Sequence, residues 1–185
     1  TVRFSTSGST FSTLAVQADD SVRLDVSVTT ATGTMRLNGD MDSSADVSDQ
    51  VVLADGVTVK AQGVLTLPAE TGGIATSGVV MMRSVADVTV SHRLVASGGA
   101  SKQVTLYSEA ASGTVAIASI TSANNPVTVT ASDIDLQGAA NMGSGHLNVH
   151  ASGTGILVGS NSPVAGALLM SDTELSRVST TGELV

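Results

Sequence analysis

The stretch Val127–Gly159 reads VTVTASDIDLQGAANMGSGHLNVHASGTGILVG, and its spacing decides the fold. Apolar residues stand two apart in the pairs Val127/Val129, Ile134/Leu136 and Leu147/Val149. Because residues two apart share one face of a β-strand, each segment has one apolar and one polar face. Glycine, serine and asparagine separate the segments, as is typical of tight turns. The stretch therefore predicts short strands joined by turns.

The same arrangement recurs earlier in the chain, which indicates an internal repeat. Ile134 stands as far from Leu147 as Val22 stands from Met35. With the strand that precedes each pair, the repeat comes to about 20 residues, the size of one turn of a β-solenoid. Further copies begin near Val59 and Val90 at irregular intervals, so additional turns or inserted loops are expected between them.

The composition favours a solenoid over other all-β folds. Aromatic residues make up 2% of the chain and there is no tryptophan, whereas a β-sandwich usually builds its core around large side chains. A narrow solenoid interior is filled by stacked Val, Ile, Leu, Ala and Met, and each turn is stabilised by its neighbours. We predict an all-β, parallel β-solenoid (β-helix) over residues 1–185, with a sandwich or jelly roll as the alternative.

The charge balance excludes several functions. The chain has 8 Lys and Arg against 16 Asp and Glu, a net charge of −8, which argues against binding to nucleic acid or to anionic membranes. No apolar run approaches the length of a membrane helix, so we expect no membrane insertion. The chain has no cysteine, and Gly98-Gly99-Ala100-Ser101-Lys102 lacks P-loop spacing. We expect no cofactor.

The stretch Val127–Gly159 resembles the repeats of filamentous-haemagglutinin-like and autotransporter-like adhesins. The segment GALLMSDTELSRV, residues 166–178, is similar to a sequence motif that follows such repeats in very large surface proteins. The third copy departs from the pattern at Ser91-His92-Arg93. The resemblance implies a right-handed parallel β-helix with a surface, adhesive or matrix role and no catalytic site.

The densest acidic run contains Asp40, Asp42, Asp46 and Asp49. Carboxylates in this pattern are weak candidates for Ca²⁺, which takes six to eight oxygen ligands. The run lacks the glycine and terminal glutamate of an EF-hand in register, and it lacks the glycine-rich nonapeptide of calcium-binding β-rolls. The favoured interpretation is a solvated loop that joins two turns, with no metal.

Two other groups of residues deserve a chemical interpretation. Asp133 and Asp135 share a strand face, and paired carboxylates act in glycosidases, but we expect an outward polar face with no cleft. His146 and His150 also share a face and suit a metal, yet a third ligand is not evident, and His92 is remote. The favoured interpretation is surface histidines. Catalytic, cofactor and metal sites are all predicted to be absent.

Two smaller features complete the expectations. Ser171 followed by Glu174 has the form of a capping box, which predicts a single helical turn or a lateral loop. Thr58, Thr89 and Thr128 are expected to stack, although same-face threonine pairs are too few to favour ice binding.

The leading functional hypothesis is a structural or adhesive protein of the cell surface or extracellular space. It would self-associate end to end as a homo-oligomer or filament, because an uncapped solenoid end presents unpaired backbone groups. Cell-surface glycan or matrix is a further expected partner. The alternatives are a passive stalk of a large secreted adhesin and, in another class, a polysaccharide-active enzyme.

Overall fold

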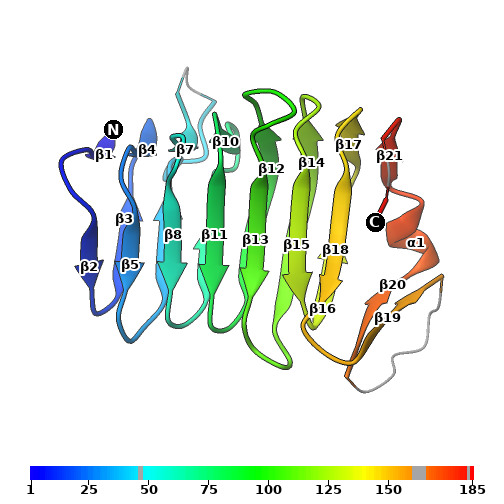
Figure 1. Cartoon of the computed structure of the whole chain (residues 1–185). Coiled ribbons are helices and arrows are strands. Elements are labelled where there is room, and N and C mark those ends of the chain that lie inside the picture. The colour runs from blue at the N-terminus through cyan, green and yellow to red at the C-terminus, as the bar shows by residue number, and fades with distance from the viewer. Residues whose placement is uncertain (46–47, 160–165, 183) are drawn as a thin grey trace.

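The computed structural model of the chain is a parallel β-solenoid of about 6 turns, spaced about 23 residues apart (Figure 1). The structure describes residues 1–45, 48–159, 166–182 and 184–185. The strand pairs in these ranges are parallel. This confirms the predicted solenoid and excludes a sandwich, whose strands are antiparallel.

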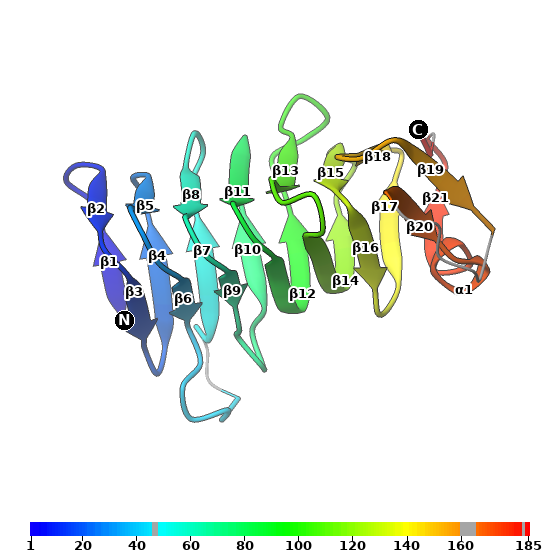
Figure 2. The same ribbon diagram turned by 90° about the horizontal axis from the view of Figure 1, so that it is seen from below.

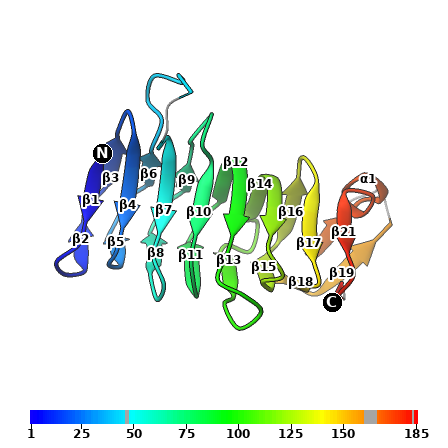
Figure 3. The ribbon, with the colours of Figure 1, turned by 90° about the horizontal axis from the view of Figure 1, so that it is seen from above.

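Each turn contributes one strand to each of three faces. The views from below and from above show these faces as separate layers (Figures 2 and 3). Face one contains β1 (Val2–Phe4), β4 (Ser21–Leu24), β7 (Gln50–Leu53), β10 (Ile74–Thr76), the second halves of β12 (Val88–Ala96) and β14 (Thr114–Ser122), β17 (Ala140–Gly143) and β21 (Val178–Thr180). Face two contains β3 (Leu14–Gln17), β6 (Met35–Asn38), β9 (Leu65–Leu67), the first halves of β12 and β14, and β16 (Asp133–Leu136).

Face three is a separate sheet of seven strands, which stand side by side along the molecule in Figure 1. They are β2 (Ser9–Phe11), β5 (Val28–Thr30), β8 (Thr58–Ala61), β11 (Val80–Ser84), β13 (Val104–Ser108), β15 (Val127–Ala131) and β18 (Leu147–Ala151). A small third sheet at the C-terminal end pairs β19 (Gly155–Val158) with β20 (Ala167–Met170), and α1 (Asp172–Leu175) follows.

The core consists of ladders of inward side chains at matching positions in successive turns. On face three one ladder runs through Val28, Val59, Met82, Leu106, Val129 and Val149. All but Val149 are fully buried, and Val149 in the last of these strands is 6% exposed. The alternation predicted from the sequence therefore places the apolar face of each strand inward. Each layer is covered by the turns on either side of it, as nearest-neighbour stabilisation requires.

Turns average about 23 residues, more than the 20 expected from the repeat, because loops are inserted at the corners. Among the stacked turns, the longest separation between consecutive strands lies between β6, which ends at Asn38, and β7, which begins at Gln50. β12 runs through a corner without interruption, and its register with β14 shifts between Val90 and Arg93. The departure seen in the sequence at Ser91-His92-Arg93 is thus a β-bulge.

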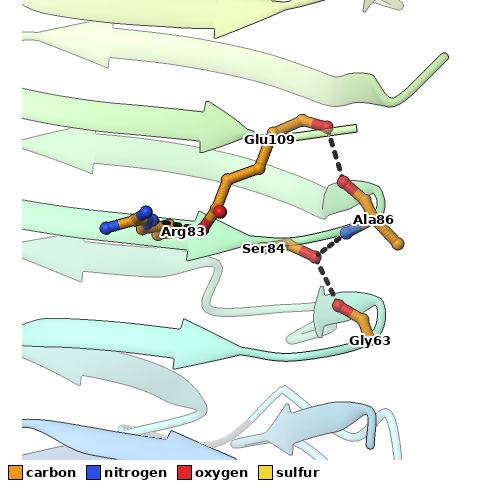
Figure 4. Close-up of polar contacts among 6 residues, drawn as sticks. Gly63, Arg83, Ser84, Ala86 and Glu109 are labelled. Carbon is orange, nitrogen blue, oxygen red and sulfur yellow. Dashed lines mark hydrogen bonds and ion pairs between the residues drawn. The ribbon is translucent and has the colours of Figure 1, made fainter. Parts of the chain in front are cut away.

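Buried serines tie the turns together where the chain leaves face three (Figure 4). The hydroxyl of Ser84 donates to the carbonyl of Gly63 in the preceding turn and accepts from the N–H of Ala86. Ser108, which is paired with Ser84, donates in turn to the carbonyl of Ala86. Both serines are fully buried, so these hydrogen bonds supply partners for backbone groups that water cannot reach.

Replacing Ser84 with alanine is expected to lower the free energy of unfolding by about 1–3 kcal/mol, because two buried backbone groups lose their partner. Equilibrium unfolding in urea measures this change. The matched control is Ser179→Ala, an exposed position on β21, where we expect a change within about 0.5 kcal/mol. An S84A variant as stable as the wild type would show that the corner serines do not hold the turns together.

Candidate functional site

An acid-lined cavity lies between β16 and α1 near the C-terminal end of the solenoid, and it is the strongest candidate site. Its volume is about 320 Å³. Its lining residues are Asp133, Ile134, Asp135, Leu169, Ser171, Thr173, Glu174 and Arg177. The expectation that no cleft lies near Asp133 and Asp135 was therefore wrong. Residues far along the chain pack over this strand, and the local pattern around Asp133 contains no sign of them.

The capping box predicted from Ser171 and Glu174 is present and builds one wall of the cavity. The Ser171 hydroxyl accepts from the N–H of Glu174, and the Glu174 carboxylate accepts from the N–H of Ser171 at 2.9 Å. The same carboxylate also accepts from the N–H of Leu136 at 3.1 Å. Glu174 is only 8% exposed, so it holds α1 against β16 as well as capping the helix.

Arg177 adds a second bond between this segment and β16, through the carbonyl group of Leu136. Its Nη1 group donates to the carbonyl of Leu136, while Glu174 accepts from the N–H of that residue. Two side chains that follow β20 thus bind both backbone groups of one residue in β16. In an edge strand these groups are otherwise left without partners, so α1 acts as a local cover for the end of face two.

Asp133 is the carboxyl group that the cavity perturbs most clearly. Burial raises the pKa of Asp133, and repulsion from the Glu174 carboxylate raises it further, with a smaller contribution from Asp135. The backbone N–H groups of Ile134 and Leu169 oppose these effects without cancelling them. The cavity is therefore lined by three carboxylates and one guanidinium, and it makes the ionised form of Asp133 less favourable than it is in water.

This arrangement lacks two features of a polysaccharide-cleaving site. The Glu174 carboxylate is already bound by Ser171 and Leu136, so it is not free to act as a nucleophile or base toward a substrate. Sugar rings are commonly held against aromatic side chains, but the chain's aromatic residues are Phe4, Phe11 and Tyr107. None of these lines the cavity. Its contacts are those of a structural corner.

Asp40 and Asp49, near the two ends of the acidic run, are buried, with exposed fractions of 1% and 2%. The expectation of a solvated loop is therefore wrong for these two residues. Their carboxylates converge on Thr71, whose hydroxyl lies 2.8 Å from Asp40 Oδ2 and 3.0 Å from Asp49 Oδ2. Burial opposes ionisation of Asp40, yet the N–H and hydroxyl of Thr71, the N–H of Ser43 and the charge of His92 together hold the pKa of Asp40 below its usual range. These contacts fasten the loop to the next turn.

The remaining calcium candidates do not join this pair. Asp42 is exposed and accepts from the N–H of Ser44, and Asp46 lies outside the described residues. Across the described ranges, no group of three or more His, Cys, Asp or Glu residues is placed to hold a metal ion. The expected absence of a metal from this loop stays a prediction.

The histidines lie on separate parts of the molecule. His146 and His150 are exposed, as expected for outward positions at the start and within β18. His92 is half-buried at the β12 bulge, where its Nδ1 atom accepts from the N–H of Ala69 at 3.4 Å. The sequence interpretation placed His92 apart from the other two, and the structure agrees.

The outward side of face three carries a line of polar side chains in register: Thr29, Lys60, Arg83, Tyr107, Thr130 and His150. Arg83 forms an ion pair with Glu109 (Figure 4) and lies 5.4 Å from the centre of the Tyr107 ring. Thr58 and Thr128 are on this face, but Thr89 is on face two. The expected stack of these three threonines was therefore wrong.

The C-terminal end of the core is open. A groove of about 280 Å³ is lined by Val149, Ile156, Val158, Met170, Leu184 and Val185. Ile156 and Val158 pair with the buried residues Leu168 and Met170, yet they are 43% and 58% exposed. They have the apolar character of core residues, but no further turn in the described chain covers them. We call this surface the end groove.

The N-terminal turn is closed differently. Phe4 and Phe11, the two phenylalanines of the chain, pack edge to face with ring centres 6.3 Å apart. With Val2 and Leu14 they are partly buried against the core. Large rings at inward positions thus fill the interior of the first turn.

Sequence reasoning found Asp133, Asp135 and the capping box separately, but it missed that Glu174 and Arg177 contact β16. The run Ser171–Val178 was the available signal, because an acidic residue on a short helical turn and a basic residue just after it can reach the N–H and the carbonyl of one residue in a neighbouring strand. The sequence did not predict the end groove itself. It indicated only that the ends of the solenoid have no polar cap. In the described ranges, no helix is long and apolar enough to cross a membrane.

No protein-family model, no curated protein and no solved structure matches the chain.

Proposed function

We propose that this chain is a non-catalytic, structural or adhesive β-solenoid segment of a cell-surface or extracellular protein, of the filamentous-haemagglutinin-like or autotransporter-like kind. It works through its extended shape, and copies associate end to end. The observation that carries the proposal is the pair of unlike ends. The end groove leaves Ile156 and Val158 exposed, and among the described residues β1, β2 and β3 of the first turn each pair on one side only.

The strands at the two ends of the described solenoid belong to the same faces, and this supports stacking of one copy on another. β1 begins face one and β21 extends it, while β2 begins face three and Leu184 extends it through its pairing with Leu147. A second copy that adds its first turn to this end would continue parallel pairing and cover Ile156 and Val158. Unpaired strand edges and exposed core residues both favour such an addition.

Sedimentation velocity and negative-stain microscopy of the 185-residue chain test end-to-end association. We expect oligomers that lengthen with concentration. Ile156→Glu should abolish them, because it would bury an unpaired charge in the joint. Met41→Glu, at an apolar position of a lateral loop that is 59% exposed against 43% for Ile156, should associate like the wild type. A wild-type chain that stays monomeric at every concentration would instead support the passive stalk.

Surface location and adhesion need their own tests. Antibodies against the chain should label intact cells of the organism that makes it, and labelling only after permeabilisation would overturn the proposed location. A glycan array and extracellular-matrix proteins would test adhesion, with the expected result being retention of the folded chain on at least one of them.

A polysaccharide-active enzyme is the second candidate, and the cavity at Asp133 and Asp135 is the observation that favours it. We propose against it because the Glu174 carboxylate is committed to backbone groups and no aromatic surface lines the cavity. Incubation with a panel of acidic and neutral polysaccharides should yield no products. Turnover that is lost in Asp133→Asn and Asp135→Asn would establish the enzyme and refute our proposal.

A further inference from the structure

The loop between β6 and β7 brings two buried carboxylates to one hydroxyl group in the next turn. Asp40 and Asp49 are 1% and 2% exposed. The hydroxyl oxygen of Thr71 lies 2.8 Å from Asp40 Oδ2 and 3.0 Å from Asp49 Oδ2. It also lies 3.4 Å from the backbone carbonyl oxygen of Ser44. Two carboxylate oxygens and a carbonyl oxygen therefore surround a single hydroxyl group.

The hydrogen-bond donors at this point are few for the oxygen atoms that face them. A threonine hydroxyl carries one proton, so it cannot donate to two carboxylates and a carbonyl at once. The N–H groups of Thr71 and Ser43 also act on the Asp40 carboxylate. Even so, the Oδ1 atom of Asp40 is buried and accepts no hydrogen bond from the described residues. Because a buried carboxylate oxygen without a donor is unfavourable, this arrangement favours a bound positive group.

The described side chains supply little positive charge to this point. None of the ion pairs found among them involves Asp40. A protonated His92 would attract the Asp40 carboxylate, but the Nδ1 atom of this ring accepts from the N–H of Ala69 at 3.4 Å. A ring nitrogen that accepts a hydrogen bond belongs to a neutral imidazole. In this arrangement His92 therefore does not offset the carboxylate charge.

The fold holds both ends of the loop in place through contacts of its own. The N–H of Asp40 donates to the buried side-chain oxygen of Asn38 at 3.1 Å. At the other end, the backbone of Asp49 packs closely against Gly72, where an added Cβ would lie 2.0 Å from the Asp49 carbonyl oxygen. The two carboxylates are thus positioned by the backbone, as a preorganised ion site requires.

The available ligands are all oxygen atoms, which suits calcium. Ca²⁺ takes six to eight oxygen ligands from carboxylates, backbone carbonyls and water, so it does not need three acidic residues. Asp40 and Asp49 offer two carboxylates and Ser44 offers a carbonyl, and water would complete the coordination. Ser44 and Thr71 are exposed, so water reaches this side of the cluster. A divalent ion would offset the charge of both carboxylates, as buried charges require.

We propose that Asp40, Asp49, the hydroxyl of Thr71 and the carbonyl of Ser44 form a calcium site that fastens both ends of the β6–β7 loop to the next turn. The two carboxylates belong to the acidic run for which the sequence favoured a loop without metal, and the proposal replaces that expectation. The site lies within one copy of the chain. It does not depend on the end-to-end association proposed above.

An amide NMR titration of the metal-free wild-type chain with CaCl₂, at constant ionic strength, tests the site. We expect saturation with a Kd of about 10⁻⁴–10⁻³ M, the range of weak calcium sites with few charged ligands. The largest shift changes should include the N–H of Thr71, which donates to Asp40 Oδ2. An unchanged Thr71 amide at about 10 mM calcium, well above this range, would overturn the proposal.

Three variants make the result specific. Asp40→Asn and Asp49→Asn keep the side-chain shape and remove one charge each. Each should weaken calcium binding by about tenfold or more, since even a group next to a metal ligand contributes about that much. Asp42→Asn is the matched control, because Asp42 is an exposed aspartate of the same loop that accepts from the N–H of Ser44, and it should bind calcium like the wild type. Affinity lost in D42N but kept in D40N would refute the site.

Thermal unfolding of the wild type covers the case in which a variant does not fold. Calcium should raise Tm above its value in EDTA, because the ion binds the folded chain and not the unfolded one. MgCl₂ at the same concentration should raise it less, since Mg²⁺ requires a near-ideal octahedral site. If the carboxylates share only a proton or a water molecule, Tm will be the same with calcium and with EDTA, and the proposal fails. These readouts do not involve oligomers, so the calcium site and the end-to-end association can fail independently.

Discussion

Met82→Ala is expected to destabilise the chain by about 2–5 kcal/mol, the usual cost of truncating a fully buried methionine. Met82 is 0% exposed and stacks between Val59 and Leu106 in the interior ladder of face three. A narrow solenoid has no second layer that could collapse into the resulting cavity, so the cost should fall in the upper part of this range. Urea unfolding monitored by circular dichroism measures the change in midpoint.

The adjacent residue provides the matched control. Met81 is on the same strand, points outward and is 37% exposed. Met81→Ala removes the same atoms from the opposite face, and we expect a change of about 0.5 kcal/mol or less. Equal losses in M81A and M82A would contradict the assignment of inward and outward positions, and with it the register of face three.

Gly73→Ala is the second large effect, with an expected loss of about 2–4 kcal/mol. Gly73 has a φ of 77°, which costs an alanine about 1 kcal/mol. A Cβ atom would also lie 2.5 Å from the carbonyl oxygen of Arg93 in the next turn. Relieving that contact requires the corner backbone to shift, which typically costs a further 1–3 kcal/mol, roughly as overpacking does.

Gly56 separates the two contributions, because its φ is 79° but nothing lies within 4 Å of the added Cβ. Gly56→Ala should therefore show only the backbone cost of about 1 kcal/mol. Thermal and urea unfolding of both variants give the comparison. If G73A and G56A lose the same stability, close stacking of the corners is not what restricts Gly73.

The most irregular part of the described chain is its C-terminal end. Most of the solenoid is regular, with each layer covered by its neighbours. At the C-terminal end, α1 replaces the usual corner, the core is open at the end groove, and one carboxyl group has a raised pKa. This is where the described chain departs from the repeat.

The local pattern of the sequence determined the strands, their inward faces and the capping box. Alternation at Val127/Val129 and Ile134/Leu136 is a property of a single strand, so it can be recognised without knowing the neighbours. The pattern failed where an inward residue is not strongly apolar. In β5 the inward residue Thr30 is polar and is buried through a hydrogen bond to the carbonyl of Gly33, and in β17 the inward residues are Ala140, which is small, and Met142.

Only the tertiary structure decided which residues meet between turns. Pairing in a parallel solenoid depends on the length of every corner between two strands, and inserted loops of different lengths shift which residues come into register. For this reason Asp40 and Asp49 meet at Thr71, Glu174 reaches Leu136, and Thr89 lies on a different face from Thr58. Strand identity is encoded locally, whereas contacts between turns depend on the summed path of the chain.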